Sequence, residues 1–272
     1  MKGKKIYPEE GTMNILVLVK RVPDTESKIR INQETNSVVE EGLNFILSPY
    51  DEYALEEALR IKGAKGGKVV AVTVGRDESL VILRKCLAMG ADEAALIKDP
   101  LPETYDGLRT ARIIARFVQA KYPDARLLLF GKQSVGADNS QVPAMVAELL
   151  GIGQANVVVK LEVEGETATA LREIEGAQEK VSLTLPAVVS AQKGLNEPRY
   201  ETLKGIMMAK KKEIPIVSIE ELGLKPDELA PRVAIIKMDQ PPARQAGRVV
   251  TGTAEDTARQ LVEYLHTEAK II

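Results

Sequence analysis

Apolar residues follow two patterns along this chain, short continuous runs and stripes with helical spacing. Residues 14–19 (NILVLV), 69–74 (VVAVTV) and 126–130 (RLLLF) are continuous runs, which are typical of parallel strands covered on both faces. Residues 108–122 carry apolar side chains at helical spacing instead. Strands alternating with helices predict an open, mainly parallel α/β sheet with right-handed crossovers.

Local signals mark the boundaries of further helices. The sequence Ser48 to Asp51 (SPYD) supplies a capping hydroxyl, a proline at the first helical position and a carboxylate in the first turn. We therefore expect a helix from there to Gly63, where glycine favours an end. A second helix is expected over residues 79–89 and a strand over residues 94–97.

After Gly151 the pattern changes to alternating strands separated by turn signals at Gly165 and Gly176. This indicates an antiparallel hairpin added to the same sheet. Short strands are expected beyond residue 214, followed by a last helix over residues 254–268. That tail is poor in core residues, so we expect it to pack on another chain.

Composition is that of an ordinary globular protein. The 272 residues are 44% hydrophobic and 28% charged, with 37 basic and 39 acidic side chains and a net charge of -2. This balance excludes a disordered chain and does not favour general nucleic-acid binding. No stretch approaches the ~20 apolar residues of a membrane span, and the first dozen residues lack the apolar centre of a signal peptide. We expect a soluble protein of the cytoplasm or an organelle matrix.

Candidate catalytic groups are few. The single histidine, His266, lies on the predicted last helix without an orienting partner, so we interpret it as a surface residue. The single cysteine, Cys86, lies on an apolar helix face and is interpreted as a small buried thiol. No cluster of cysteine and histidine suggests a zinc or iron–sulfur site.

The loop over residues 131–142 follows a buried strand and leads into a helix with Pro143 near its start. It is not a Walker loop, because Gly136 is followed by Ala-Asp where Lys-Ser/Thr is required. The later Gly151-Ile-Gly153 likewise lacks the third glycine of a dinucleotide fingerprint. Free N–H groups at the helix start suit an anion. An ordinary strand-to-helix turn, capped by Asn139 or Ser140, is the alternative.

Residues 170–190 (ALREIEGAQEKVSLTLPAVVS) resemble the beta subunit of electron-transfer flavoproteins. The matching positions are Ala170, Arg172, Glu175, Gly176, Glu179, Val181, Pro186, Val188, Val189 and Ser190. A plain hairpin explains the alternation but not Arg172 beside Glu173 or the placement of Pro186. NEPRYETL, IMMAKKKEI, VLVKRVPD and GKQ are also similar to the family, so the resemblance spans residues 13–270.

The resemblance implies a heterodimer in which the alpha subunit carries the redox FAD. The beta subunit is then an adenine-nucleotide-hydrolase-like α/β protein that binds AMP. Electrons come from flavin dehydrogenases, such as acyl-CoA dehydrogenases, and pass to a quinone reductase or another acceptor. In eukaryotes the family is located in the mitochondrial matrix. A carrier of this kind needs no acid or base of its own, since a flavin performs the chemistry.

The resemblance also places the nucleotide site at the carboxyl ends of the strands. The implied residues are Leu18, Ser48, Pro49, Tyr50, Asp51, Val74, Gly131, Lys132, Gln133, Ser134, Val135, Gly136, Ala137, Asp138, Asn139, Ser140, Gln141 and Val142. The phosphate is expected on N–H groups around residues 140–142. The implied organisation is an extension over residues 1–13, a nucleotide-binding domain over 14–224, and a C-terminal arm over 225–272 that packs on the partner subunit.

The chain departs from the family at residues 140–143. Members that hold AMP read Asn-Gln-Thr-Gly there and flavin-bifurcating members tend towards Ala-Gln-Val-Gly, whereas this chain reads Ser-Gln-Val-Pro. Val142 removes a hydroxyl and Pro143 removes an N–H donor. A second FAD in place of AMP, with NADH as the electron donor, therefore stays an alternative. A standalone nucleotide-binding or nucleotide-hydrolysing module and a purely structural scaffold are the alternatives from other classes.

Two partner contacts are implied by the same resemblance. The segment over residues 199–208 is expected to dock partner dehydrogenases, with Leu203 entering an apolar pocket; its implied contact residues are Arg199, Tyr200, Leu203, Ile206 and Met207. The alternative is that Leu203, Ile206 and Met207 form a helical core face. Arg172 and Glu173 are expected to close a strand and to act at the subunit interface.

Overall fold

The structure is a computed structural model that describes residues 13–99, 106–242 and 246–272. Most of the predicted N-terminal extension, residues 1–12, lies outside the described residues. The chain divides into one compact unit that reaches Lys237 and a second unit over Met238–Ile272.

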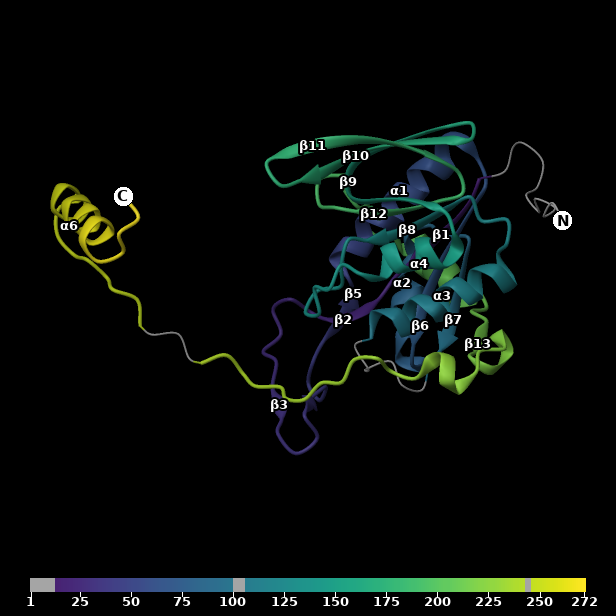
Figure 1. The fold of residues 1–272 in the computed structure, drawn as a ribbon, viewed down its shortest axis with the longest axis horizontal. Helices are drawn as coiled ribbons and strands as arrows, with labels where there is room; N and C mark the ends of the chain where they lie inside the picture. Colours follow the sequence, from purple (N-terminus) through teal and green to yellow (C-terminus); the bar gives the residue numbers. More distant parts are fainter. Residues whose placement is uncertain (1–12, 100–105, 243–245) are drawn as a thin grey trace. The chain divides into compact units, whose positions relative to one another are not determined.

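The first unit is built around a nine-stranded sheet with the order β11-β10-β9-β12-β8-β1-β6-β7-β13 (Figure 1). All neighbours pair in parallel except β10, which is antiparallel to β9 and β11. Its strands are β1 (Asn14–Leu18), β6 (Lys68–Gly75), β7 (Glu93–Lys98), β8 (Leu127–Gly131), β9 (Gly153–Glu164), β10 (Thr167–Ile174), β11 (Ala177–Thr184), β12 (Ala187–Ala191) and β13 (Ile216–Ser218). Two small antiparallel sheets pair β2 (Arg21–Pro23) with β5 (Phe45–Leu47) and β3 (Ile31–Asn32) with β4 (Ser37–Val38). The predicted open, mainly parallel α/β sheet is confirmed.

Helices cover the two faces of the sheet. They are α1 (Pro49–Lys65), α2 (Leu80–Met89), α3 (Gly107–Lys121), α4 (Val142–Leu150) and α5 (Leu203–Lys211), with short 3-10 turns at Asp77–Ser79, Glu220–Leu222 and Pro226–Leu229. On one face α1, α2 and α5 pack against Ile15 and Val17 of β1. On the other, α3 and α4 pack against Leu16 and Leu18. Successive strand residues point to opposite faces, so one apolar run supplies both cores.

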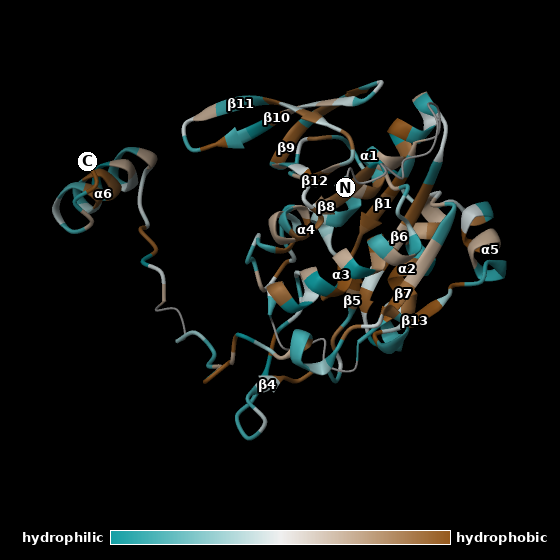
Figure 2. Ribbon diagram, turned by 45° about the vertical axis from the view of Figure 1, so that its right-hand side comes forward, coloured by the Kyte–Doolittle hydropathy of each residue, from teal (hydrophilic) through white to brown (hydrophobic). Residues whose placement is uncertain are grey.

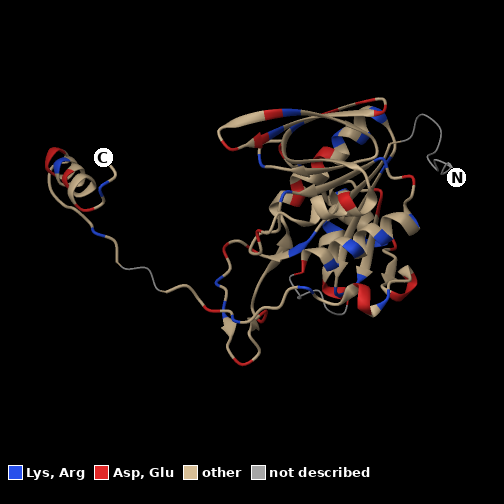
Figure 3. Ribbon diagram, in the orientation of Figure 1, with Lys and Arg blue, Asp and Glu red and all other residues tan. Residues whose placement is uncertain are grey.

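Apolar and charged residues occupy different parts of this fold. The central strands, such as β1, carry the apolar colouring (Figure 2), and charged residues lie mainly on the helices and loops around them (Figure 3). The predicted helix ends are close to the observed ones. The first helix nevertheless continues past Gly63 to Lys65, because Gly63 keeps helical geometry and the left-handed glycine that ends the helix is Gly66, with φ 75°.

The predicted hairpin is confirmed as β10 and β11, which extend the sheet beyond β9. Gly165, in the turn from β9 to β10, has φ 53°, and Gly176, in the turn from β10 to β11, has φ 72°. Glycine adopts such positive φ values at little cost. The second unit contains α6 (Ala254–Thr267), which has no buried residue, and Leu261 and Val262 are 50% and 55% exposed. No helix within the described ranges is long and apolar enough to span a membrane.

Candidate functional site

At the carboxyl ends of β1 and β8, the connections to the next helices leave the sheet on opposite faces. These strands are neighbours, but α1 follows β1 on one face of the sheet while α4 follows β8 on the other. Open α/β sheets bind ligands at such a point, because the two connections leave a crevice between them. Of the predicted nucleotide-site residues, Leu18 ends β1, the SPYD sequence opens α1, and residues 131–142 join β8 to α4. The structure therefore brings these segments to one edge of the sheet.

Asp51 links the two strands at this edge. Its carboxylate accepts hydrogen bonds from the backbone N–H of Lys20, at 2.7 Å, and from that of Gly131, at 3.1 Å. A Cβ added at Gly131 would lie 2.7 Å from the Cβ of Tyr50, so only glycine allows α1 to approach the strand end this closely. Asp51 thus holds the ends of β1 and β8 in register from the first turn of α1.

Asp51 is buried, and this burial changes the pKa of its carboxyl. Loss of water raises the pKa of the Asp51 carboxyl to about 7. The two N–H groups and the Lys20 ammonium lower this pKa, but their effect is smaller. A carboxylate that already binds both N–H groups leaves neither for a ligand phosphate. A ligand at this edge must therefore find its donors in the loop that follows β8.

The loop over residues 131–142 is ordered by its own polar side chains. Gln133 donates to Asp138 at 2.7 Å and accepts from the Ser140 hydroxyl at 2.9 Å. Asp138 and Ser140 both have positive φ, 49° and 52°, which turns the chain sharply before α4. The ammonium of Lys132 lies 5.0 Å from the centre of the Tyr50 ring. Two elements of the predicted site, the loop and the start of α1, are therefore in contact.

Two capping predictions are wrong. The cap of α4 is Gln141, without a side-chain capping bond, whereas Ser140 is engaged with Gln133 and cannot serve as the cap. Ser48 precedes α1 but its hydroxyl makes no capping bond. Both helix starts thus lack side-chain caps, and the uncapped start of α4 suits an anionic ligand. The fully buried Ser48 hydroxyl also finds no hydrogen-bond partner among the described residues.

These features are the polar contacts that this edge of the sheet offers a ligand. The uncapped start of α4 and the cations Lys20 and Lys132 can bind an anion. The unpartnered Ser48 hydroxyl at the start of α1 can bind a polar group. The Lys20 ammonium lies 3.4 Å from the Ser134 hydroxyl, which brings a cation to the loop. Sequence reasoning missed Lys20 as a site residue, although its place directly after the first strand was the available signal.

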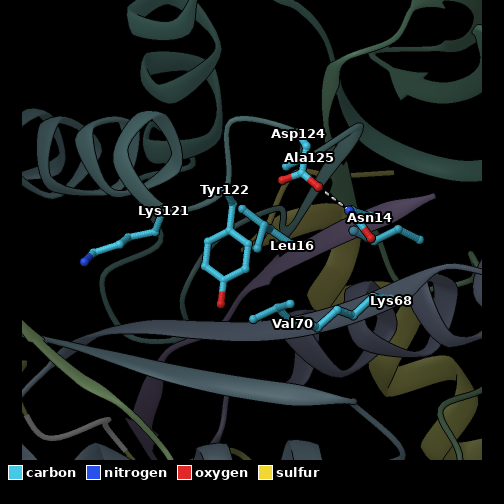
Figure 4. Close-up of a pocket in the computed structure, with 9 residues that line it drawn as sticks. Asn14, Leu16, Lys68, Val70, Lys121, Tyr122, Asp124 and Ala125 are labelled. Atoms are coloured by element: carbon cyan, nitrogen blue, oxygen red, sulfur yellow. Dashed lines mark hydrogen bonds between the residues drawn. The ribbon is translucent and has the colours of Figure 1, made fainter. Parts of the chain in front are cut away.

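A separate hollow in the first unit lies at the other edge of the sheet. A cavity of about 230 Å³ opens at the amino ends of β1 and β6, between Asn14, Lys68 and Tyr122 (Figure 4). Asn14 donates to Asp124 across its mouth. Because amino and carboxyl ends are opposite edges of a parallel sheet, this cavity is separate from the predicted nucleotide site.

The predicted docking segment begins as an extended stretch and continues as α5. Tyr200, Leu203 and Met207 are 93%, 84% and 67% exposed, while Ile206 packs against the core. The alternative of a core face formed by Leu203, Ile206 and Met207 is therefore wrong for Leu203 and Met207, because α5 turns only Ile206 and Ala209 inward. Arg199 is bound instead to Glu56 of α1.

Arg172 and Glu173 lie on opposite faces near the end of β10. Arg172 pairs with Glu179 of β11 at 3.3 Å, and Glu173 accepts from the Gln192 amide at 3.0 Å. The strand continues to Ile174, one residue beyond the predicted end. A register shift between Leu171 and Arg172 turns this tip relative to β9.

Neither the single histidine nor the single cysteine has the surroundings of a catalytic group. His266 is exposed on α6, and its ring nitrogen contacts only the Ile272 carbonyl at 3.0 Å. Cys86 is fully buried, and burial raises the pKa of its thiol, which keeps it protonated and unreactive. No group of three or more acidic, histidine or cysteine side chains is placed to hold a metal ion in that part of the chain.

Comparison with known proteins identifies the family. The electron transfer flavoprotein domain matches residues 35–222. The chain belongs to the electron transfer flavoprotein family. It is similar to proteins named electron transfer flavoprotein subunit beta: 41% identical to that of Bacillus subtilis, over 96% of this chain and 100% of the relative. Identity is 39% to that of Mus musculus (92% and 97% covered) and 36% to that of Thermoanaerobacterium thermosaccharolyticum (94% and 98% covered).

The electron transfer flavoprotein match includes the start of α1, the loop before α4, the hairpin tip and the predicted docking segment.

Proposed function

We propose that this chain is the beta subunit of a heterodimeric electron-transfer flavoprotein. The alpha subunit carries the FAD that accepts and donates electrons. Electrons arrive from flavin-containing dehydrogenases, such as acyl-CoA dehydrogenases, and leave to a quinone reductase or another acceptor. The observation that carries this proposal is similarity to named beta subunits over at least 92% of the chain.

In this role the chain positions partners and a nucleotide. When bound in the partner subunit, FAD supplies electron transfer. This chain's own residues offer an exposed apolar face on α5 for docking and the charged side chains Arg172 and Glu173 on the hairpin tip. They also offer an exposed apolar helix, α6, on the C-terminal arm. Unpartnered apolar surface of this kind is typical of protein interfaces.

We propose AMP as the ligand at the carboxyl ends of β1 and β8. Its phosphate would lie at the start of α4 with Lys20 or Lys132 as counter-charge, and its polar groups would engage the buried Ser48 hydroxyl. The contacts within the 131–142 loop support this reading, because they fix the loop before a ligand arrives and so reduce the ordering cost of binding.

A second FAD is the candidate that one observation favours. Pro143 occupies the first turn of α4, where it removes an N–H donor that the phosphate of AMP would use. Val142 also lacks the threonine hydroxyl of AMP-binding members and matches the valine of flavin-bifurcating members, which bind FAD here and oxidise NADH.

The deciding experiment is to denature the purified heterodimer and to measure the released flavin and AMP. One flavin and one AMP per heterodimer are expected. Two flavins without AMP would replace the AMP assignment with the FAD alternative. A matched variant, Val142→Thr with Pro143→Gly, restores a hydroxyl and an N–H donor and should bind AMP more tightly.

The same preparation tests the alternatives from other classes. A chain that purifies without a flavoprotein partner, and that binds or hydrolyses ATP alone, is a standalone nucleotide module. A purified protein that contains neither nucleotide nor flavin would favour the structural scaffold.

A further inference from the structure

Glu56 is a buried carboxylate on the central part of α1. Its exposed fraction is 5%, and it accepts three hydrogen bonds from Arg199, which lies 143 residues further along the chain. The Arg199 backbone N–H donates at 3.1 Å, and the guanidinium donates through Nε at 2.7 Å and Nη2 at 2.8 Å. Such a forked contact fixes both the position and the orientation of the arginine.

A second contact joins the same two segments. Glu57 is 4% exposed and accepts from the Asn196 amide at 2.9 Å, and the same amide donates to the Tyr53 carbonyl at 3.0 Å. Burial raises the pKa of Glu57, against Asn196 and Arg60, which lower it. Adjacent carboxylates on α1 therefore hold the entry to the docking segment at two points.

The far end of the docking segment is held by α2 and the residues after it. Arg84 donates to the carbonyls of Ala209 and Lys212, and Lys212 donates to the Asp92 carbonyl at 2.7 Å. Gly205 lies against the Ala88 carbonyl so closely that a Cβ there would overlap it. The segment is thus anchored before and after the exposed apolar side chains.

Burying a carboxylate is costly unless it is well paired, and an apolar contact would secure a surface segment at lower cost. An ionic contact sets one geometry instead. We propose that Glu56 is a positioning residue for partner docking, which acts through Arg199 to hold Tyr200, Leu203 and Met207 as a rigid apolar face. This inference rests on the proposed docking function of residues 199–208. It assigns Arg199 to the support of that face and not to contact with the partner.

The test is Glu56→Gln in the full heterodimer, with an acyl-CoA dehydrogenase that reduces the wild-type protein as the probe. The amide still accepts the Arg199 N–H but loses the charge that orients the guanidinium. The KM for the heterodimer should rise about two- to tenfold, because a partner must then order the loosened segment on binding. The kcat, the flavin content and the flavin spectrum should stay unchanged.

The matched control is Glu52→Gln on the same helix. Glu52 pairs instead with Lys85 of α2 at 2.6 Å. Its KM should equal that of the wild type. Arg199→Gln removes the same contact from its half-exposed side. It should raise the KM to the same extent, and it replaces Glu56→Gln as the test if Glu56→Gln folds poorly.

Leu203→Ala distinguishes a failure of the Glu56 role from a failure of the docking function. If Glu56 acts through the docking face, its effect on KM should be less than multiplicative when combined with Leu203→Ala. An unchanged KM in Glu56→Gln and Arg199→Gln, with a raised KM in Leu203→Ala, would mean that the contact only stabilises the fold. An unchanged KM in Leu203→Ala would overturn the docking function itself.

Discussion

Leu203 and Ile206 are three residues apart on α5 but face different surroundings. Leu203 is 84% exposed, whereas Ile206 packs against the core on the α1 and α2 side of the sheet. Truncating Leu203 to alanine should therefore leave the melting temperature unchanged. If the leucine fills a partner pocket, losing about 1.5 to 3 kcal/mol of burial should weaken the dehydrogenase complex about ten- to hundredfold.

Ile206→Ala is the internal control for that measurement. Removing a side chain that packs against the core should lower the free energy of unfolding by about 1 to 3 kcal/mol. A large fall in melting temperature for Leu203→Ala, with normal dehydrogenase kinetics, would contradict the docking role.

Asp51 should make stability depend on pH near neutrality. An aspartate in the unfolded chain has a pKa of about 4, whereas the folded value is about 7. Between these values the folded protein keeps a proton that the unfolded chain has released. The stabilisation is complete below the unfolded pKa and is lost as pH rises through the folded one.

Melting curves from pH 5 to 8 check this expectation. The melting temperature of the wild type should fall relative to that of Asp51→Asn as pH rises, because the amide cannot ionise. The total change in unfolding free energy should be on the order of a few kcal/mol. Parallel pH profiles for the two proteins would show that the Asp51 carboxyl does not titrate in this range.

At the scale of elements, the contact between α5 and α2 depends on one glycine. Gly205 lies on the Ala88 carbonyl at the end of α2, where an added Cβ would overlap the oxygen. Gly205→Ala should lower the melting temperature although alanine favours helices by about 1 kcal/mol. The displaced α5 should also dock dehydrogenases less tightly.

Gly63 of α1 is the matched control, since nothing lies within 4 Å of a Cβ added there. Gly63→Ala should raise stability by about 0.5 to 1 kcal/mol through helix propensity alone. Equal melting temperatures for the two variants would mean that α5 shifts away from α2 without cost.

At the scale of the whole molecule, α6 belongs to a unit of its own and has no buried residue. An isolated amphipathic helix of this length is marginal in water, so a partner surface is needed to stabilise it. We expect Leu261→Asp to reduce co-purification of the alpha subunit at least tenfold. The first unit should keep its melting temperature.

Gln260→Asp places the same carboxylate one residue earlier, on an exposed polar position of α6. This control should leave subunit association intact. If both variants associate normally, the C-terminal arm does not bind the alpha subunit through this face.

The sequence by itself determined the order and type of the main elements. The runs NILVLV, VVAVTV and RLLLF are buried strands because strands covered on both faces need continuous apolar residues. Gly165 and Gly176 predicted the turns on either side of β10, because turns with positive φ favour glycine. The family resemblance was also present in the sequence, since its motifs are local strings of residues.

Only the tertiary structure decided which distant groups meet. Asp51 binds Gly131, 80 residues away, because β8 inserts beside β1, and no local pattern specifies that neighbour. The same folding leaves Ser48 without its expected capping bond and joins Glu56 to Arg199 across 143 residues. Helical spacing placed Leu203, Ile206 and Met207 on one stripe, but the packing of α5 on α2 determined which of them are buried. Local periodicity reports that a face is apolar, whereas long-range packing decides whether it meets the core or a partner.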